Sequence, residues 1–188
     1  IYVHVSSRPT SPFISNSTEC LLGPEYALLR PDFFQLRQTA LKKRQGPFEL
    51  NNILLSVGGM AQKNIIQFIL EALNKVHFKK SPTINIVLSS QAPELKEIKK
   101  ISDSHQLKIN VLTDVNNMAS LMLEADFSLG AAGSTAWERC TLGLPGVVIC
   151  TADNQKEILK NLKKEKAHLV YDYNNQKNSN DLAELINT

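Results

Sequence analysis

From about residue 51 onward, short apolar runs alternate with longer segments whose apolar residues recur at helical spacing. Residues 53–57 read ILLSV, and a short run of this kind is typical of a strand that is buried on both faces. In the next segment, residues 64–76, the apolar side chains fall on one face of a helix. The pattern therefore predicts one strand followed by one helix.

The same alternation continues to the end of the chain. It predicts further strands at residues 83–88, 108–112, 126–129, 146–150 and 168–171. It predicts further helices at 93–102, 116–124, 154–164 and 179–186, and one that follows the glycine-rich turn at Gly130. Apolar strands that are each followed by a helix predict an α/β fold, a Rossmann-like doubly wound parallel sheet. Ligands of such sheets bind at the carboxyl ends of the strands. The loops to inspect are therefore those after Val57, Leu88, Leu112, Leu129 and Cys150.

The first fifty residues do not follow this rhythm. Residues 1–5 could form a strand, residues 6–18 are rich in Ser, Thr and Pro, and residues 33–43 could form a helix after Pro31. We interpret residues 1–50 as a connector or interdomain arm and residues 51–188 as the Rossmann-like domain. Because the chain begins with Ile1 and not with methionine, we expect it to be a piece of a longer protein.

Composition narrows the classes of function. The 188 residues are 43% hydrophobic and 21% charged, which is typical of a soluble globular protein. The net charge of +3 is scattered, which indicates a solvated surface and not a nucleic-acid footprint. No apolar run approaches the roughly 18 residues of a membrane span, so no membrane span is predicted. The three cysteines are far apart and lack C-x-x-C spacing, so we expect neither a zinc site nor disulfides, and a cytoplasmic location.

Two glycine turns at predicted strand ends are candidate ligand sites. Gly58 and Gly59 follow ILLSV, and the run GAAGST, residues 130–135, follows the strand that ends at Leu129. Glycine lets the backbone approach a ligand closely, and the free amides at a helix start suit an anion such as a diphosphate. Ser134 and Thr135 would add hydroxyl donors there.

The glycine-rich turn before Thr135 and the loop after the strand at 146–150 each also have a purely structural explanation. Thr135 and Glu138 have the T-x-x-E spacing of a capping box, in which the glutamate only satisfies the start of its own helix. After the strand at 146–150, Asp153 or Asn154 could cap the next helix, or polar residues of this loop could bind sugar hydroxyls. Spacing alone leaves both alternatives open.

The remaining candidates point to structure. His4, His77, His105 and His168 have no spacing to a carboxylate or serine that would indicate a triad or a metal site. We expect Trp137, Met118 and Met122 to be core residues, and Cys140 and Cys150 to be small buried hydrophobes. The sequence contains no convincing general base or nucleophile, and it predicts no catalytic residue, no metal and no cofactor.

Four segments together resemble a known family. They read CLLGPEYALLRPDF from Cys20, ILLSVGG from Ile53, GAAGSTAWERCTLGLP from Gly130 and ADNQ from Ala152. In this order they resemble the C-terminal half of the UDP-sugar hydrolases of pseudaminic acid biosynthesis. Those enzymes remove UDP from UDP-2,4-diacetamido-2,4,6-trideoxy-β-L-altropyranose. They are similar in fold to the peptidoglycan N-acetylglucosaminyltransferase, with two Rossmann-like domains in the GT-B arrangement.

The resemblance implies a nucleotide-sugar site. Gly133, Ser134 and Thr135 would face the diphosphate, and Glu138 would hold the ribose hydroxyls. The Gly58–Gly59 turn would line the nucleotide pocket, and Asn154 and Gln155 would face the sugar or its phosphate. The partner would be UDP or a UDP-sugar, and the YALLR segment, residues 26–30, would lie near the cleft across which an N-terminal domain packs.

The chain departs from the family pattern in two ways. The family usually has an Asp-Pro pair after the first glycine turn, where this chain has Ala61 and Gln62. The family's hydrolytic histidine lies in a Gly-His motif of the N-terminal domain, which IYVH at the start of this chain does not resemble, so His4 is not a substitute. Two alternatives therefore stay open, a GT-B glycosyltransferase domain that uses a UDP-sugar donor and a non-catalytic nucleotide-binding module.

Overall fold

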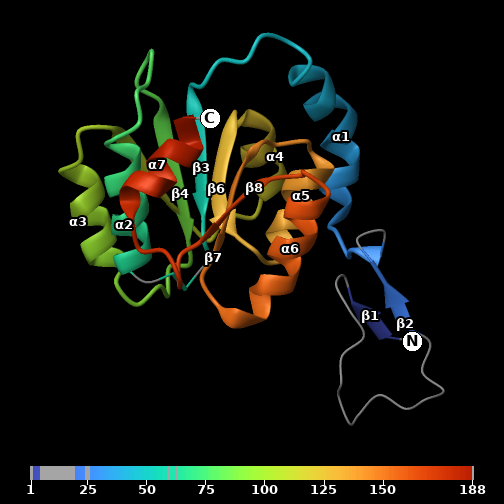
Figure 1. The fold of residues 1–188 in the computed structure, drawn as a ribbon. Coiled ribbons are helices and arrows are strands. Elements are labelled where there is room, and N and C mark those ends of the chain that lie inside the picture. The colour runs from blue at the N-terminus through green and yellow to red at the C-terminus, as the bar shows by residue number, and fades with distance from the viewer. Residues whose placement is uncertain (1, 5–19, 24–25, 59, 62, 188) are drawn as a thin grey trace.

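The body of the protein is a parallel sheet with helices on both faces (Figure 1). Its structure, a computed structural model, describes residues 2–4, 20–23, 26–58, 60–61 and 63–187. The sheet has six strands in the order β5-β4-β3-β6-β7-β8, all parallel. Their bounds are β3 (Asn52–Ser56), β4 (Thr83–Leu88), β5 (Lys108–Thr113), β6 (Phe127–Ala131), β7 (Gly146–Cys150) and β8 (Leu169–Asp172).

The strand order is that of a doubly wound Rossmann-like sheet. Within this sheet the chain runs from β3 outward through β4 to β5, and then returns to β6 on the other side of β3. The direction of winding therefore reverses between β3 and β6, which is where such sheets bind ligands. The predicted fold class is confirmed.

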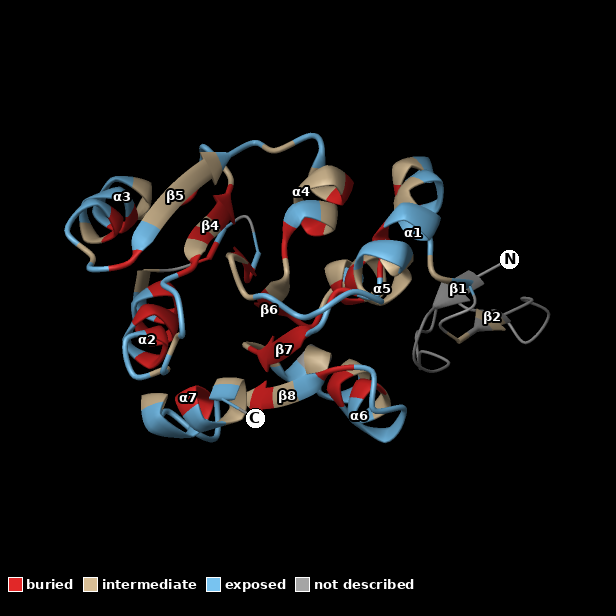
Figure 2. Cartoon of the chain, turned by 90° about the horizontal axis from the view of Figure 1, so that it is seen from above, coloured by how far each residue is buried: buried red, intermediate tan, exposed pale blue. Residues whose placement is uncertain are grey.

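Two groups of helices cover the sheet (Figures 1 and 2). On one face lie α2 (Lys63–Leu73), α3 (Leu95–Asp103) and α7 (Ser179–Asn187). On the other lie α1 (Pro31–Lys43), α4 (Met118–Glu124), α5 (Ser134–Thr141) and α6 (Lys156–Lys164). Alternate residues of β3 serve the two cores, because Ile53 and Leu55 belong to the first and Leu54 to the second. Across the described residues, every helix is too short or too polar to cross a bilayer.

Helix α1 packs on α4 and α5, although it precedes the first strand of the sheet. Phe33 and Ala40 are fully buried in this contact, and the helix forms where the sequence predicts one after Pro31. Further toward the N-terminus, β1 (Tyr2–His4) pairs in parallel with β2 (Cys20–Leu22). A strand is therefore present near the start of the chain, as the sequence predicts. Residues 6–18 lie outside the described residues.

Several predicted boundaries are wrong by one or two residues. The helix expected from Pro93 begins at Leu95, because the amide of Leu95 still bonds the Ala92 carbonyl in the preceding turn. The helix expected from Asn154 begins at Lys156, after a 3₁₀ turn, η2 (Asp153–Gln155). Helix α5 ends at a glycine. Gly143 has φ of 59°, and its amide and that of Leu144 bond the carbonyls of Cys140 and Arg139 in a Schellman motif.

Candidate functional site

The five loops singled out from the sequence meet in one cavity at the carboxyl edge of the sheet. The cavity has a volume of about 450 Å³ and spans the point between β3 and β6 where the winding reverses. Each loop contributes lining residues, among them Gly58 after β3, Ser89 after β4, Asp114 after β5, Gly133, Ser134 and Thr135 after β6, and Gln155 after β7. The structure thus brings together five of the residues predicted from the sequence: Gly58, Gly133, Ser134, Thr135 and Gln155.

The start of α5 opens into this cavity. Gly133 is the N-cap residue, and Ser134 and Thr135 are the first two residues of the helix. The first amides of an α-helix have no carbonyl partner within the helix, and they carry the positive end of its dipole. A Cβ atom added at Gly133 would meet nothing within 4 Å, and the residue has an ordinary extended backbone with φ of −119°. The fold itself therefore does not require glycine here.

Gly58 differs from Gly133 in its backbone. Its φ of 108° is a conformation that favours glycine, and its added Cβ would also meet nothing within 4 Å. The β3 loop thus turns sharply and leaves open space beside the cavity. Gly59, predicted as its partner in the nucleotide pocket, lies outside the described residues.

The capping box that the sequence offered as a structural alternative is absent. Helix α5 begins one residue before Thr135, and its N-cap Gly133 has no side chain to receive a bond. Instead, Glu138 faces Arg30, whose Nη2 lies 3.8 Å from Oε1 of the carboxylate. Burial raises the pKa of Glu138, and the positive charges of Arg30 and Arg139 oppose this rise. The Glu138 side chain, 13% exposed, is thus a partly buried carboxylate one helical turn beyond Thr135.

Arg30 ties this carboxylate to the segment before α1. Its Nη1 donates a hydrogen bond to the Asn116 carbonyl at 3.3 Å, and its guanidinium lies 5.2 Å from the centre of the Phe33 ring. Arg30 is the last residue of the YALLR segment, and its side chain is 46% exposed. The ion pair of Arg30 with Glu138 joins residues more than one hundred positions apart, so no local pattern in the sequence could have indicated it.

The loop after β7 is organised by Gln155. Its Oε1 accepts hydrogen bonds from the Thr151 amide at 2.9 Å and from the Thr151 hydroxyl at 3.3 Å. Asp153 does not cap a helix, since it is exposed and pairs with Lys156 at 2.7 Å. The side chain of Asn154 lies outside the described residues. Gln155 is therefore the member of the predicted Asn154 and Gln155 pair that the structure puts on the cavity.

A buried arginine behind the cavity was missed from the sequence. Arg139 is 1% exposed, its Nη2 donates to the Ala131 carbonyl at 2.9 Å, and its Nη1 lies 3.5 Å from the Thr135 hydroxyl. Burial lowers its pKa to about 10, so it remains charged at neutral pH. Gly130 leaves the room for it, because an added Cβ there would lie 2.9 Å from Cζ of Arg139. Arg139 thus links the end of β6 to the start of α5.

Among the histidines whose burial the structure describes, His77, His105 and His168, only His168 is deeply buried. It is 8% exposed, and its Nδ1 lies 3.6 Å from Sγ of Cys140. Burial, together with the charge of Arg139, lowers its pKa to about 4, so the ring is neutral at pH 7.

Met122 and Cys150 are buried as expected, whereas Met118 is only partly buried and lines the cavity. No three His, Cys, Asp or Glu side chains gather into a metal site in the part of the chain that the structure describes.

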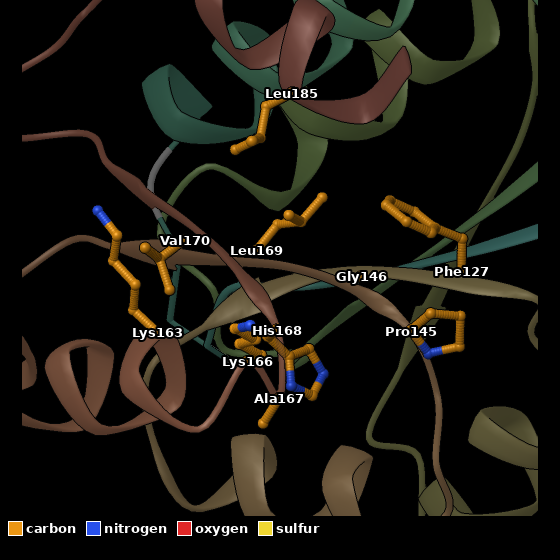
Figure 3. A pocket seen from close by; sticks show the side chains of 10 residues that line it. All are labelled: Phe127, Pro145, Gly146, Lys163, Lys166, Ala167, His168, Leu169, Val170 and Leu185. Atoms are coloured by element: carbon orange, nitrogen blue, oxygen red, sulfur yellow. The ribbon is translucent and has the colours of Figure 1, made fainter. Parts of the chain in front are cut away.

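A separate hollow of about 480 Å³ lies at the opposite edge of the sheet (Figure 3). Phe127, Gly146 and Leu169, the first residues of β6, β7 and β8, line it, so it opens at the amino ends of the strands. Lys163 and Lys166 are its charged residues. Because ligands of doubly wound sheets bind at the carboxyl ends, this hollow is not the candidate site.

The region that forms the sheet and the cavity also shows which protein family the chain belongs to. The sequence profile of the glycosyltransferase family 28 C-terminal domain matches residues 52–188, which include the whole six-stranded sheet and every residue that lines the cavity. The chain belongs to this family. Residues 52–188 correspond to the C-terminal domain of this family.

Two curated relatives differ in what they are named for. The spore coat polysaccharide biosynthesis protein SpsG of Bacillus subtilis is 28% identical over 170 residues, which cover 90% of this chain and 48% of SpsG. The UDP-2,4-diacetamido-2,4,6-trideoxy-beta-L-altropyranose hydrolase of Campylobacter jejuni is 29% identical over 155 residues, which cover 82% of this chain and 52% of the hydrolase. The chain therefore spans about half the length of these relatives.

Solved structures agree on the fold. MurG of Acinetobacter baumannii matches with a TM-score of 0.65 at 21% identity, over 78% of this chain and 43% of MurG. The UDP-GlcNAc 2-epimerase of Methanocaldococcus jannaschii, solved in complex with UDP-GlcNAc and UDP, matches with a TM-score of 0.57 at 16% identity, over 82% of this chain and 44% of the epimerase. The domain therefore has the fold of one half of a GT-B protein.

Proposed function

We propose that this domain binds the UDP part of a UDP-sugar in the cavity at the carboxyl edge of the sheet. The observation that carries the proposal is the convergence of five carboxyl-end loops on one cavity at the start of α5, which the first helical residues Ser134 and Thr135 line with their hydroxyl-bearing side chains. Gly133 and Gly58 leave open space that would let a diphosphate approach the backbone. Gly59 would belong to the same turn.

Glu138 would hold the ribose hydroxyls. It lies one turn along α5 from Thr135, so a nucleoside whose diphosphate meets the helix start could reach it. To bind ribose, the carboxylate would exchange its contact with Arg30 for two hydroxyl donors. At 3.8 Å and with Arg30 half-exposed, that ion pair is weak enough to be exchanged.

The parent protein would be a hydrolase that releases UDP from UDP-2,4-diacetamido-2,4,6-trideoxy-β-L-altropyranose in pseudaminic acid biosynthesis. The named hydrolase of Campylobacter jejuni supports this substrate. An N-terminal domain would pack across the cleft near residues 26–30 and supply the catalytic histidine, and Gln155, with Asn154, would face the sugar or its phosphate. The reaction would take place in the cytoplasm without a metal or another cofactor.

A glycosyltransferase that uses a UDP-sugar donor is the second candidate. The match to glycosyltransferase family 28 and the structural likeness to MurG support it. Both candidates use the same nucleotide site and differ in what attacks the sugar. Incubating the whole parent protein with the UDP-sugar, with and without a cell-envelope acceptor, separates them. The hydrolase releases free sugar at the same rate in both reactions, and the transferase requires the acceptor.

Substituting Gly133 tests the nucleotide site directly. Gly133→Ala leaves the fold intact, because its added methyl group meets no protein atom and its φ suits any residue. In the proposed site the methyl group occupies the space of the diphosphate, and we expect UDP binding measured by calorimetry to weaken at least about tenfold, which corresponds to about 1.4 kcal/mol.

Gly46→Ala is the matched control. Gly46 is exposed in the loop between α1 and β3, and its added Cβ would make only an ordinary contact of 3.5 Å with the Lys43 carbonyl. We expect its UDP affinity to equal that of the wild type. Gly130 is unsuitable for this test, because Arg139 lies behind it and a substitution would disturb the fold. Equal UDP affinity of Gly133→Ala and Gly46→Ala would contradict the proposed site.

A further inference from the structure

A second cavity adjoins the first at Gly58. It has a volume of about 630 Å³ and shares Val57 and Gly58 with the cavity proposed to hold UDP. Its other walls come from the start of α2, from the loop after β7 and from the segment after β8, and they include Ala61, Asn64, Ile65, Thr151, Tyr173 and Lys177. None of these six residues was singled out from the sequence as a site residue.

The second cavity offers one aromatic ring with polar groups around it. Tyr173 is held by an edge-on contact with Phe68, with the ring centres 4.9 Å apart, and the ammonium of Lys177 lies 5.4 Å from the centre of the Tyr173 ring. Asn64 is exposed in the first turn of α2 and adds an amide. Among the described residues that line the two cavities, Lys177 is the one with a positively charged side chain.

Gln155 connects the two cavities. It lines the first, and its Oε1 fixes both the amide and the hydroxyl of Thr151, which lines the second. A ligand that contacts Gln155 in the first cavity therefore contacts a side chain that also positions Thr151 in the wall of the second cavity. Gly58, which has no side chain, lines both cavities.

We propose that the sugar ring of the nucleotide sugar occupies this second cavity, with the face of the pyranose against Tyr173. A UDP-sugar has a nucleoside at one end of its diphosphate and a sugar at the other. With the diphosphate at the start of α5, the sugar passes Gly58 into the second cavity. Asn64 and Lys177 carry donors suited to the carbonyl oxygens of acetamido groups. The Thr151 hydroxyl donates its hydrogen to Gln155, so its oxygen can accept from a sugar hydroxyl. Ala61 and Ile65 form an apolar wall for methyl groups. This inference rests on the function proposed above for the UDP part.

Saturation-transfer NMR and calorimetry on the full chain test the sugar cavity. The probes are UDP, UDP-GlcNAc and UDP-2,4-diacetamido-2,4,6-trideoxy-β-L-altropyranose, and the variants are Lys177→Met and Tyr173→Leu. The control is Lys163→Met, which removes an exposed lysine from the hollow at the opposite edge of the sheet. In the wild type, we expect saturation to reach the sugar protons of at least one UDP-sugar as well as the uridine protons.

Lys177→Met should weaken binding of that UDP-sugar about tenfold, since it removes a charged hydrogen-bond donor, and leave the affinity for UDP unchanged. Tyr173→Leu should abolish saturation of the sugar protons while the uridine signals stay.

If Tyr173→Leu fails to fold because Phe68 loses its contact, the Lys177→Met variant still tests the proposal, because Lys177 is exposed. If UDP itself does not bind, the function proposed for the domain fails. If UDP binds but the sugar protons are silent in the wild type, or Lys177→Met behaves like Lys163→Met, the sugar cavity is wrong and the nucleotide site stands.

Discussion

The Glu138 carboxylate lies where the candidate site meets the segment before α1, and a conservative substitution tests its role. In the proposed site it accepts hydrogen bonds from ribose, so we expect Glu138→Gln to weaken UDP binding about tenfold. Pyrophosphate has no ribose, and its affinity should stay the same or rise, because the substitution removes a negative charge. Calorimetric titrations with both ligands measure the difference.

The same carboxylate should make UDP binding depend on pH. Burial raises the pKa of Glu138 above its ordinary value, so the stronger, ionised acceptor is lost on acidification earlier than for an exposed glutamate. In the wild type, UDP affinity should therefore fall more steeply on mild acidification than it does in Glu138→Gln. Parallel pH profiles, or an equal loss of pyrophosphate binding, would assign Glu138 a structural role.

His168 should make the stability of the domain depend on pH. Its pKa in the folded state, about 4, is lower than the ordinary value of 6.5, so unfolding takes up a proton in the window between them. The stabilisation is therefore complete above pH 6.5 and is lost as the pH falls toward 4, to a limit of about 3 kcal/mol. Urea unfolding at several pH values measures this slope.

His168→Leu should flatten that slope, because leucine cannot take up the proton. His77→Leu is the control, since His77 is exposed and its substitution should leave the slope unchanged. The comparison concerns slopes at each pH, so a constant loss of stability in His168→Leu through altered packing does not affect it. A wild-type slope retained in His168→Leu would show that other groups cause the acid sensitivity.

Single side chains were the hardest feature to predict from the sequence. The T-x-x-E pattern of Thr135 and Glu138 indicated a capping box, yet the helix starts one residue earlier and the carboxylate turns to Arg30. Arg139 was not singled out from the sequence, although it is buried behind Gly130. Both outcomes depend on residues brought together by folding, so spacing along the chain does not contain them.

Secondary-structure elements were predicted far better than their ends. The six strands and the helices between them follow from local apolar periodicity, and β4 and β7 have the predicted bounds. Helix starts shifted where a turn competed with the first helical bonds, as at Leu95 and Lys156. The sequence also predicted α1, but not that it packs on α4 and α5, and the division between an arm and a domain at residue 51 stays a prediction.

The end of α4 is held by Lys43 of α1. The lysine ammonium donates to the carbonyls of Leu123 and Glu124 at 3.1 and 2.8 Å, and to Oδ1 of Asp126 at 2.9 Å. A cation at a helix C-terminus complements the helix dipole. The Lys43 side chain is 40% exposed, so solvent weakens the charge term, and we expect Lys43→Met to lower the free energy of unfolding by about 1 kcal/mol.

Lys42→Met is the matched control for this contact between helices. Lys42 is also exposed in the last turn of α1, and its substitution removes the same charge. Urea unfolding should place it within about 0.5 kcal/mol of the wild type, as is usual for surface positions. Equal effects of the two substitutions would mean that net charge, and not the capping of α4, is responsible.

At the scale of the whole molecule, the parallel sheet separates the cavity at its carboxyl edge from the hollow at its amino edge. The loops after β3, β4, β5, β6 and β7 converge on one cavity at the carboxyl edge, which is where the strand pattern predicts a ligand site. The hollow in Figure 3 lies at the amino ends of β6, β7 and β8. A ligand at the carboxyl edge should therefore order one side of the sheet selectively.

Hydrogen exchange with and without UDP tests this asymmetry. At 100 times its Kd, UDP stabilises the folded state by about 2.7 kcal/mol, so amides that exchange only through global unfolding slow about 100-fold throughout the core. Loop amides exchange through local opening and respond only where the ligand lies. We expect added protection at the loop after β3 and at residues 132–135, and none at the loops before β7 and β8, which border the opposite hollow. Protection confined to the loops before β7 and β8 would instead move the nucleotide to the amino edge, against the winding of the sheet.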